Sequence, residues 1–109
     1  MNVSMISVPE LQTLAATALR AAGASALQAE STARALVAAD VQGLATHGVS
    51  RVAMYTSHLR TGRVRGNAVP QVRTARPAAV LVDAGDGFAF PACELALQEA
   101  IARARTEGL

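Results

Sequence analysis

The sequence predicts an α+β fold that is mainly helical, with three N-terminal helices, one or two short strands and one C-terminal helix. Before residue 62, residues typical of helix starts are followed by long stretches in which apolar residues recur at helical spacing. Glycine, asparagine and proline then interrupt that period up to residue 77. A short apolar run and a final helical pattern follow. We therefore expect a helical subdomain over residues 1–62, and a connector, strands and a helix over residues 63–109.

The first two helices are each predicted by a capping box. Ser7 and Glu10 have the spacing of the first box, with a proline inside the first turn, and that helix should end near Gly23. Ser25 and Gln28 form the second box, and the helix after it should continue to the next glycine. Because a short glycine-containing link joins the two helices, we expect them to pack as an antiparallel or crossing pair.

A third helix is predicted over about residues 47–61, with Thr46 as a side chain suited to cap it. In such a helix His47, Arg51 and Tyr55 lie at i, i+4 and i+8 and share one face. Together they offer an imidazole that titrates near neutral pH, a planar guanidinium that fits a carboxylate, and a neutral hydroxyl. Each residue type is also common on an ordinary helix surface, so the spacing alone leaves a structural role open.

The segment after the third helix is expected to be an extended connector. Gln71–Thr74 is a candidate strand and Ala79–Asp83 a stronger one, whose unbroken apolar run predicts coverage on both faces. The glycine-rich turn at Asp83–Gly87 lacks the phosphate-loop patterns, and its two carboxylates would repel phosphate. A plain turn is therefore the better interpretation.

The last helix should begin near Pro91 and end at Gly108, a residue typical of helix C-termini. Cys93 lies in its apolar pattern and is expected to be a small buried side chain. A single cysteine excludes an intrachain disulfide and a cysteine-based zinc site, and no metal site is predicted.

Composition and charge narrow the function classes. The hydrophobic content of 51% argues against intrinsic disorder, and no apolar run reaches the roughly 18 residues of a membrane span. No secretory signal is recognisable, so a cytoplasmic location without a membrane partner is expected. All ten basic residues are arginine, and their local cluster at 60–76 contains no aromatic residue. A solvated loop is therefore favoured over a nucleic-acid surface.

The motif around His47 resembles a known family. Thr46–Arg51 is similar to the (S/T)-H-G-x-x-R motif of the malate/L-lactate dehydrogenase family of type-2 ketoacid reductases, which includes ureidoglycolate, sulfolactate and 2,3-diketogulonate dehydrogenases and cyclic-imine reductases. Ala39–Asp40, Gly43, Tyr55 and Asp83 follow the family pattern at the usual offsets. The resemblance covers essentially the whole chain and matches the N-terminal part of the family.

The resemblance implies a role for each residue of the helical motif. His47 would take part in proton transfer at the reacting carbonyl or hydroxyl, Arg51 would hold the substrate carboxylate, and Tyr55 would line the same pocket. NAD or NADP would transfer a hydride to or from a small 2-oxo or 2-hydroxy acid. The family fold is a larger, non-Rossmann α/β fold, and residues 63–109 would open its cofactor subdomain. The cofactor-binding residues are not identifiable in this chain.

Family members are longer than this chain, so the resemblance also implies a truncated fragment that is not active alone. Such a fragment would need the missing C-terminal portion, and the family's subunits are dimeric. The alternative is a non-enzymatic helical module for dimerisation or interaction, related to that family. The identity of the 2-hydroxy acid and the choice between NAD and NADP stay open.

Overall fold

A computed structural model describes residues 4–108. Residues 1–3 and Leu109, which the expected subdomain boundaries include, lie outside the described residues. The described part contains four α-helices and a two-stranded antiparallel sheet, which confirms the mainly helical α+β prediction. The elements are α1 Val8–Ala21, α2 Ala26–Val41, α3 Val52–Arg60, β1 Gln71–Arg76, β2 Ala79–Asp83 and α4 Ala89–Glu107.

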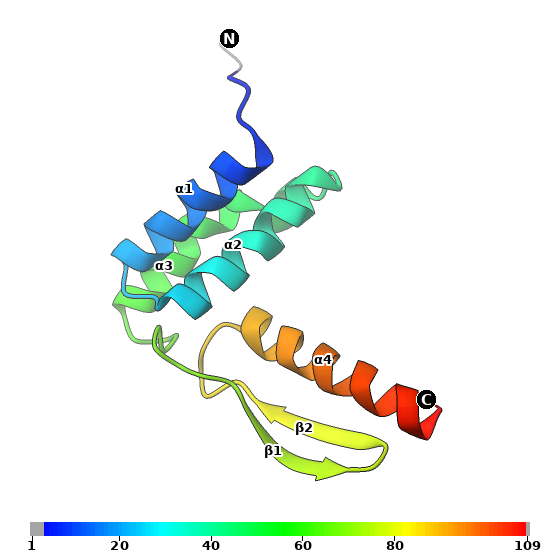
Figure 1. The fold of residues 1–109 in the computed structure, drawn as a ribbon. Coiled ribbons are helices and arrows are strands. Elements are labelled where there is room, and N and C mark those ends of the chain that lie inside the picture. Colours follow the sequence, from blue (N-terminus) through cyan, green and yellow to red (C-terminus); the bar gives the residue numbers. More distant parts are fainter. Residues whose placement is uncertain (1–3, 109) are drawn as a thin grey trace.

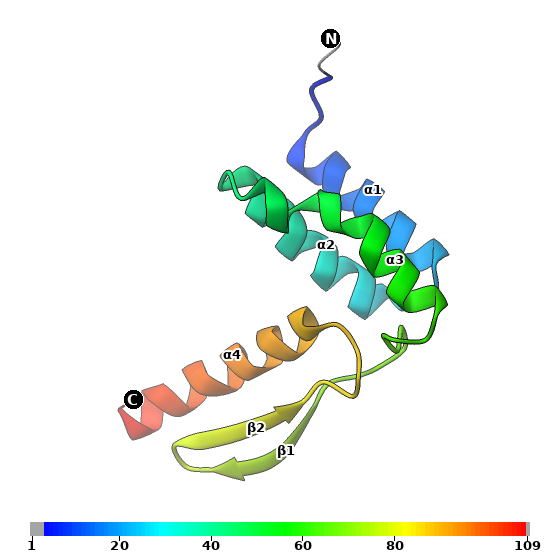
Figure 2. The same ribbon diagram turned by 180° about the vertical axis from the view of Figure 1, so that it is seen from behind.

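The elements form two groups along an elongated molecule of 54 × 30 × 20 Å. Helices α1, α2 and α3 pack together at one end, and the hairpin with α4 forms the other (Figure 1). Seen from behind, α3 lies against α1, and the connector runs from α3 down to the hairpin (Figure 2). None of the helices in the described range 4–108 has the length and apolar character needed to cross a membrane.

The predicted helix starts are confirmed at the two serine caps. Ser7 Oγ accepts from the Glu10 amide and Ser25 Oγ accepts from the Gln28 amide, each at 3.2 Å. Both capping boxes are nevertheless only half formed, which corrects the prediction, because within residues 4–108 neither Glu10 nor Gln28 accepts from the amide of its serine. The Gln28 side chain is fully buried and points away from the cap. Its Nε2 donates to the Ala68 carbonyl at 2.7 Å, and its Oε1 accepts from the Phe88 amide at 2.9 Å.

The connector is also more folded than predicted. It makes successive turns instead of running extended, and its Gly66 carbonyl accepts from the Ser25 amide at 2.7 Å. A Cβ on Gly66 would lie 2.2 Å from the Gly23 carbonyl oxygen, so only glycine permits this close approach. The main apolar core forms nearby, where α1, α2 and α3 meet the start of α4; its buried members are Leu19, Ala24, Ala29, Leu59 and Phe88.

The hairpin confirms the bounds of the second predicted strand, while the first strand extends to Arg76. Gln71 pairs with Asp83 and Arg76 pairs with Ala79, with one irregularity in the register between them. The prediction that the second strand is covered on both faces is wrong. Leu81 is 59% exposed, because α4 is the main element that packs against the sheet within residues 4–108. An apolar run therefore does not by itself establish burial on both faces.

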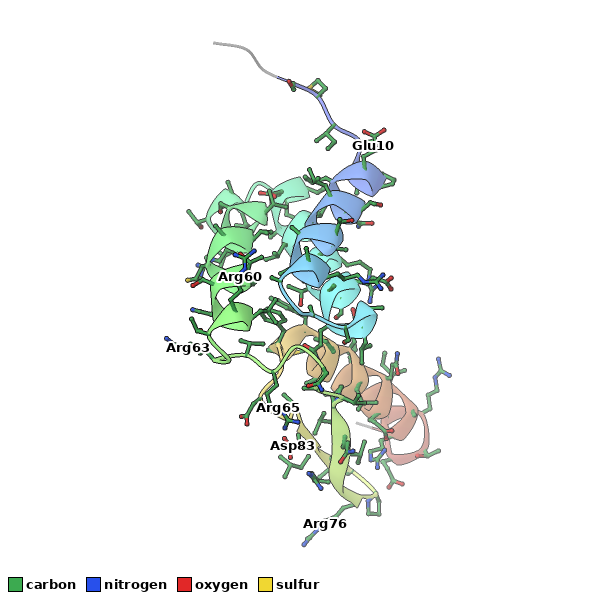
Figure 3. The ribbon with its side chains drawn as sticks, turned by 90° about the vertical axis from the view of Figure 1, so that its left-hand side faces the viewer. Glu10, Arg60, Arg63, Arg65, Arg76 and Asp83 are labelled. Atoms are coloured by element: carbon green, nitrogen blue, oxygen red, sulfur yellow. The ribbon has the colours of Figure 1, made fainter. Side chains whose placement is uncertain are left out.

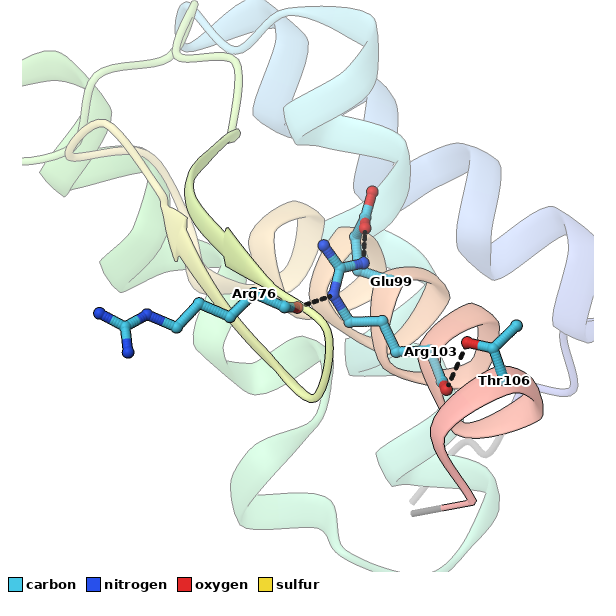
Figure 4. Close-up of polar contacts among 4 residues, drawn as sticks. All are labelled: Arg76, Glu99, Arg103 and Thr106. Carbon is cyan, nitrogen blue, oxygen red and sulfur yellow. Dashed lines mark hydrogen bonds and ion pairs between the residues drawn. The ribbon is translucent and has the colours of Figure 1, made fainter.

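Helix α4 runs from Ala89 to Glu107 and is followed by Gly108 as its C-cap, with a left-handed φ of 75°. Arg103 fixes this helix to the hairpin by donating from Nε to the Arg76 carbonyl at 3.1 Å, and it also pairs with Glu99 (Figure 4). Cys93 is exposed on α4, so the expectation that it is buried is wrong. The helical period placed Cys93 correctly on a helix, but α4 covers only one face of a small sheet.

Candidate functional site

The segment that carries the predicted site is not one continuous α-helix. Residues Ala45–His47 and Val49–Arg51 form two short 3-10 turns, and α3 begins only at Val52. Gly48 separates the turns with an extended conformation, φ −98° and ψ −150°. The expected α-helix over residues 47–61, with one shared face, is therefore corrected. His47 precedes the helix, while Tyr55 lies within it.

The break at Gly48 has a local cause in the Asp40 side chain. A Cβ on Gly48 would lie 1.9 Å from Asp40 Oδ1, so the backbone approaches the carboxylate more closely than any other residue type allows. Asp40 Oδ2 accepts a hydrogen bond from the Val49 amide at 2.9 Å. Asp40 therefore satisfies a backbone donor at the start of this segment, a role that the sequence had suggested for Thr46. No side-chain cap from Thr46 is present.

Thr46 instead joins the two charged or titratable residues of the predicted site. Its Oγ1 lies 3.0 Å from His47 Nδ1, and its carbonyl accepts from Arg51 Nε at 2.8 Å. Ser50 Oγ donates to the Ala45 carbonyl at 2.9 Å and closes the same turn. His47 therefore bonds to the hydroxyl of Thr46 and Arg51 to its carbonyl, although His47 and Arg51 do not share a helix face.

The hydrogen bond at Nδ1 determines which nitrogen of His47 is available for chemistry. A threonine hydroxyl can donate to a neutral imidazole or accept from a protonated one. Nδ1 can therefore stay hydrogen bonded in both charge states. His47 is exposed, so its Nε2 is the nitrogen suited to exchange a proton with a bound molecule.

Arg51 is half-buried and its Nε is engaged with the Thr46 carbonyl. The hydrogen bond orients the plane of the guanidinium and does not use its two terminal nitrogens. Two parallel donors at the end of a fixed plane match the two oxygens of a carboxylate. A guanidinium held in this way can therefore bind a carboxylate end-on.

Tyr55 lies in different surroundings. Its ring centroid is 5.2 Å from that of Phe88 and 6.4 Å from those of Phe90 and His58. The ring packs against the apolar core, and no hydrogen bond of its hydroxyl is found within residues 4–108. These contacts give Tyr55 a packing role between α3 and the start of α4. Its place in a substrate pocket stays a prediction.

A shallow apolar groove of about 250 Å³ lies between α1 and the segment that carries Arg51. Val49 and Val52, on either side of Arg51 and its neighbour Ser50, line it from one side. A larger groove of about 390 Å³ lies between α1 and α2. Neither groove is lined by His47, Arg51 or Tyr55.

The turn before α4 does not fit the pyrophosphate of a dinucleotide. Asp83 Oδ1 accepts from the Gly85 amide at 2.8 Å, and this bond, helped by Arg73, holds the pKa of the Asp83 carboxyl below its usual value. The turn therefore carries a firmly ionised carboxylate. The Phe88 amide at the start of α4 is already bonded to Gln28, and Pro91 has no amide hydrogen. Within residues 4–108 no cluster of three or more His, Cys, Asp or Glu could hold a metal.

The arginines of the predicted connector cluster do not converge on this site. Arg60 and Arg63 lie on α3 and just after it, Arg65 lies on the connector near Asp83, and Arg76 lies at the tip of the hairpin (Figure 3). Arg73 pairs with Asp83 at 3.1 Å. The cluster in the sequence is therefore spread along the molecule.

The comparisons with known proteins agree with this architecture. The profile of the malate/L-lactate dehydrogenase family matches residues 6–109. The (2R)-3-sulfolactate dehydrogenase (NADP(+)) of Chromohalobacter salexigens is 45% identical over 105 residues, which cover 96% of this chain and 31% of that protein. A Delta(1)-pyrroline-2-carboxylate/Delta(1)-piperideine-2-carboxylate reductase of Pseudomonas putida is 37% identical and covers 97% of this chain and 32% of that protein.

A solved structure adds the fold. The delta1-piperideine-2-carboxylate reductase of Pseudomonas syringae superposes with a TM-score of 0.91 at 35% identity, over 96% of this chain and 32% of that chain. The fold thus matches about 32% of a solved reductase chain. The chain belongs to the malate/L-lactate dehydrogenase family. It spans about 31% of the length of the sulfolactate dehydrogenase that it matches.

Proposed function

We propose that this chain forms the acid-binding side of the active site of a nicotinamide-dependent oxidoreductase. The observation that supports this most directly is the pair of hydrogen bonds made by Thr46. They hold His47 through Nδ1 and Arg51 through Nε, at 3.0 and 2.8 Å. The candidate proton carrier and the candidate carboxylate binder are therefore both anchored to Thr46.

The guanidinium of Arg51 indicates the class of substrate. Arg51 would bind a carboxylate, and His47 would then lie next to the adjacent carbon substituent. The relatives' names fit this chemistry, since sulfolactate is a 2-hydroxy acid and pyrroline-2-carboxylate is a cyclic imine with its carboxylate on the imine carbon. In each case the carboxylate is attached to the carbon that changes oxidation state. We therefore propose a small 2-oxo, 2-hydroxy or cyclic 2-imino acid as substrate.

The proton step would belong to His47. Reduction of a carbonyl adds a proton to oxygen, and reduction of an imine requires a protonated nitrogen. An imidazolium at His47 would supply this proton from Nε2 while Thr46 keeps Nδ1 bonded. Tyr55, anchored by Phe88, is proposed as a residue lining the same pocket, with its hydroxyl as a further polar group.

The cofactor of the family, NAD or NADP, supplies the hydride in these reactions. Because the turn before α4 does not fit a pyrophosphate, we assign no cofactor contact to the described residues. We propose that residues 1–62 carry the acid-binding motif and that residues 63–109 begin the part that would meet the cofactor region. A dimeric state and a cytoplasmic location are kept as proposals.

Complementation tests the function directly. The chain is mixed with a polypeptide corresponding to the part of the sulfolactate dehydrogenase that it does not match, and nicotinamide absorbance is followed with 2-oxo acids and pyrroline-2-carboxylate. Turnover should need both pieces. Arg51→Lys should lower it by roughly 100-fold, because lysine keeps the charge but loses the planar fork. Arg60→Lys, at the exposed end of α3, is the matched control. No gain over either piece alone would count against the proposal.

An interaction module is the second candidate function, and exposed apolar side chains favour it. Leu14, Val41, Leu81 and Leu97 are each between 59% and 65% exposed. Such side chains are often covered by another polypeptide. This alternative predicts that His47→Ala leaves partner binding or dimerisation unchanged while no combination of pieces gives turnover. Sedimentation velocity of the chain and of the variant measures the first part.

A further inference from the structure

We propose that Asp40 is the positioning residue for Arg51, and that it acts by preventing residues 45–51 from forming a continuous α-helix. This inference rests on the proposed function for its consequence, because positioning matters only if this side chain receives a substrate. The structural part stands on hydrogen bonds that do not involve a substrate.

The Val49 amide does not make the hydrogen bond of a continuous α-helix. In a continuous α-helix this amide would bond to the Ala45 carbonyl, four residues before it. It donates to Asp40 Oδ2 at 2.9 Å instead. The Ala45 carbonyl accepts from the Ser50 hydroxyl at 2.9 Å and from the Gly48 amide at 3.3 Å. Asp40 has therefore replaced a helical acceptor.

The Thr46 carbonyl also lacks its helical hydrogen-bond donor. A continuous helix would engage it with the Ser50 amide. With the helix interrupted, this carbonyl accepts from Arg51 Nε at 2.8 Å. The bond that orients the guanidinium thus depends on the interruption, and the interruption depends on the Asp40 carboxylate.

A further reason is steric. Gly48 is buried against the carboxylate, and a Cβ there would meet Asp40 Oδ1, Cγ and Oδ2 at 1.9, 2.2 and 2.4 Å. Asp40 and Gly48 therefore form a matched pair in which the glycine makes room for the acid. Asp40 is fixed near the end of α2, so it gives the turns a rigid reference point. A positioning residue on a regular helix is more precise than one on a loop.

The test uses the 109-residue chain and nuclear magnetic resonance. The Arg51 Nε–H should give a resolved, slowly exchanging signal because it is bonded to Thr46. Asp40→Ala should remove this protection, raise helicity over residues 45–51 and weaken binding of oxamate, a stable 2-oxo-acid isostere, by at least about tenfold. Asp40→Asn should restore most of both signals, since an amide oxygen can still accept from Val49. Glu30→Ala, on the exposed face of α2, is the control and should change neither.

A second variant tests the same hydrogen bonds while Asp40 is kept. Gly48→Ala should displace the Asp40 carboxylate and release the Arg51 Nε–H in the same way, so it decides the question if Asp40→Ala does not fold. A folded Asp40→Ala or Gly48→Ala chain that keeps the protected Nε–H and full oxamate affinity would overturn the inference. The wild-type chain serves to separate the two proposals. If it binds no acid while Asp40→Ala still releases the Nε–H, the proposed function fails and the positioning role of Asp40 stands.

Discussion

The buried side chain of Gln28 gives the sharpest stability prediction. It is 0% exposed and joins α2 to the connector and to the start of α4, through Ala68 and Phe88. Gln28→Ala leaves a buried carbonyl and a buried amide without partners, and each such group costs about 1–3 kcal/mol. We therefore expect a loss of about 2–6 kcal/mol in the free energy of unfolding. That is a large fraction of the roughly 5–15 kcal/mol typical of a whole domain.

Urea unfolding followed by circular dichroism measures this loss, with Gln98→Ala on the exposed face of α4 as the control. Gln28→Glu sharpens the test, because an ionised carboxylate can accept from Phe88 but cannot donate to Ala68. Burial and the facing carbonyl would raise the pKa of the introduced carboxyl in the folded state. That variant should therefore become more stable as pH falls through the raised value. A loss below about 1 kcal/mol for Gln28→Ala would refute the stabilising role of the two Gln28 hydrogen bonds, since one buried unpaired group alone should cost that much.

Three further predictions concern other contacts. Gly48→Ala should destabilise the chain by about 1–3 kcal/mol through overpacking, and combining it with Asp40→Ala should cost less than the sum of the two, as measured by a double-mutant cycle in urea. The lowered pKa of Asp83 means that its stabilising effect is present above the ordinary carboxyl range and is lost as pH falls through the lowered value; Asp83→Asn should remove this part of the acid dependence, and an unchanged acid profile would contradict it. Arg34→Ala breaks an exposed 2.9 Å ion pair between α2 and α4 and should cost less than about 1 kcal/mol, with a larger loss in the same urea assay arguing for a stronger contact.

Local signals in the sequence were sufficient for the helix starts and the hairpin. Ser7 and Ser25 cap helices because their hydroxyls reach an amide within the same turn, and this depends on neighbours alone. The bounds of β2 follow from its apolar run and the flanking glycine-rich turn. The family motif also singled out His47, Arg51 and Tyr55, and the first two have side chains bonded to Thr46, while the roles of all three stay predictions.

Contacts between distant residues account for the corrections. Gln28 has the right spacing for a capping box, but a partner 40 residues away and another 60 residues away attract its side chain instead. The start of α3 depends on Asp40, which lies on the preceding helix and cannot be found by helical period. Gly48 itself was the available signal in the sequence, since glycine often occurs where another group approaches the backbone closely. A glycine does not indicate which group approaches it, so the contact with Asp40 could not be predicted.

The proposed acid site depends only on neighbouring residues, so we expect it to form without the cofactor. Every hydrogen bond described for the site links residues between Asp40 and Arg51. None comes from the hairpin or from α4, whose side-chain ion pairs are made mostly within that group. The helices that support the site are rich in alanine, which buries little area, so backbone and side-chain hydrogen bonds contribute much of its definition. We therefore expect the chain to bind a small 2-oxo acid without nicotinamide, and calorimetric titration with oxamate in the absence and presence of NADP should give the same affinity. A binding signal that requires NADP would mean that residues 40–51 do not form the acid site by themselves.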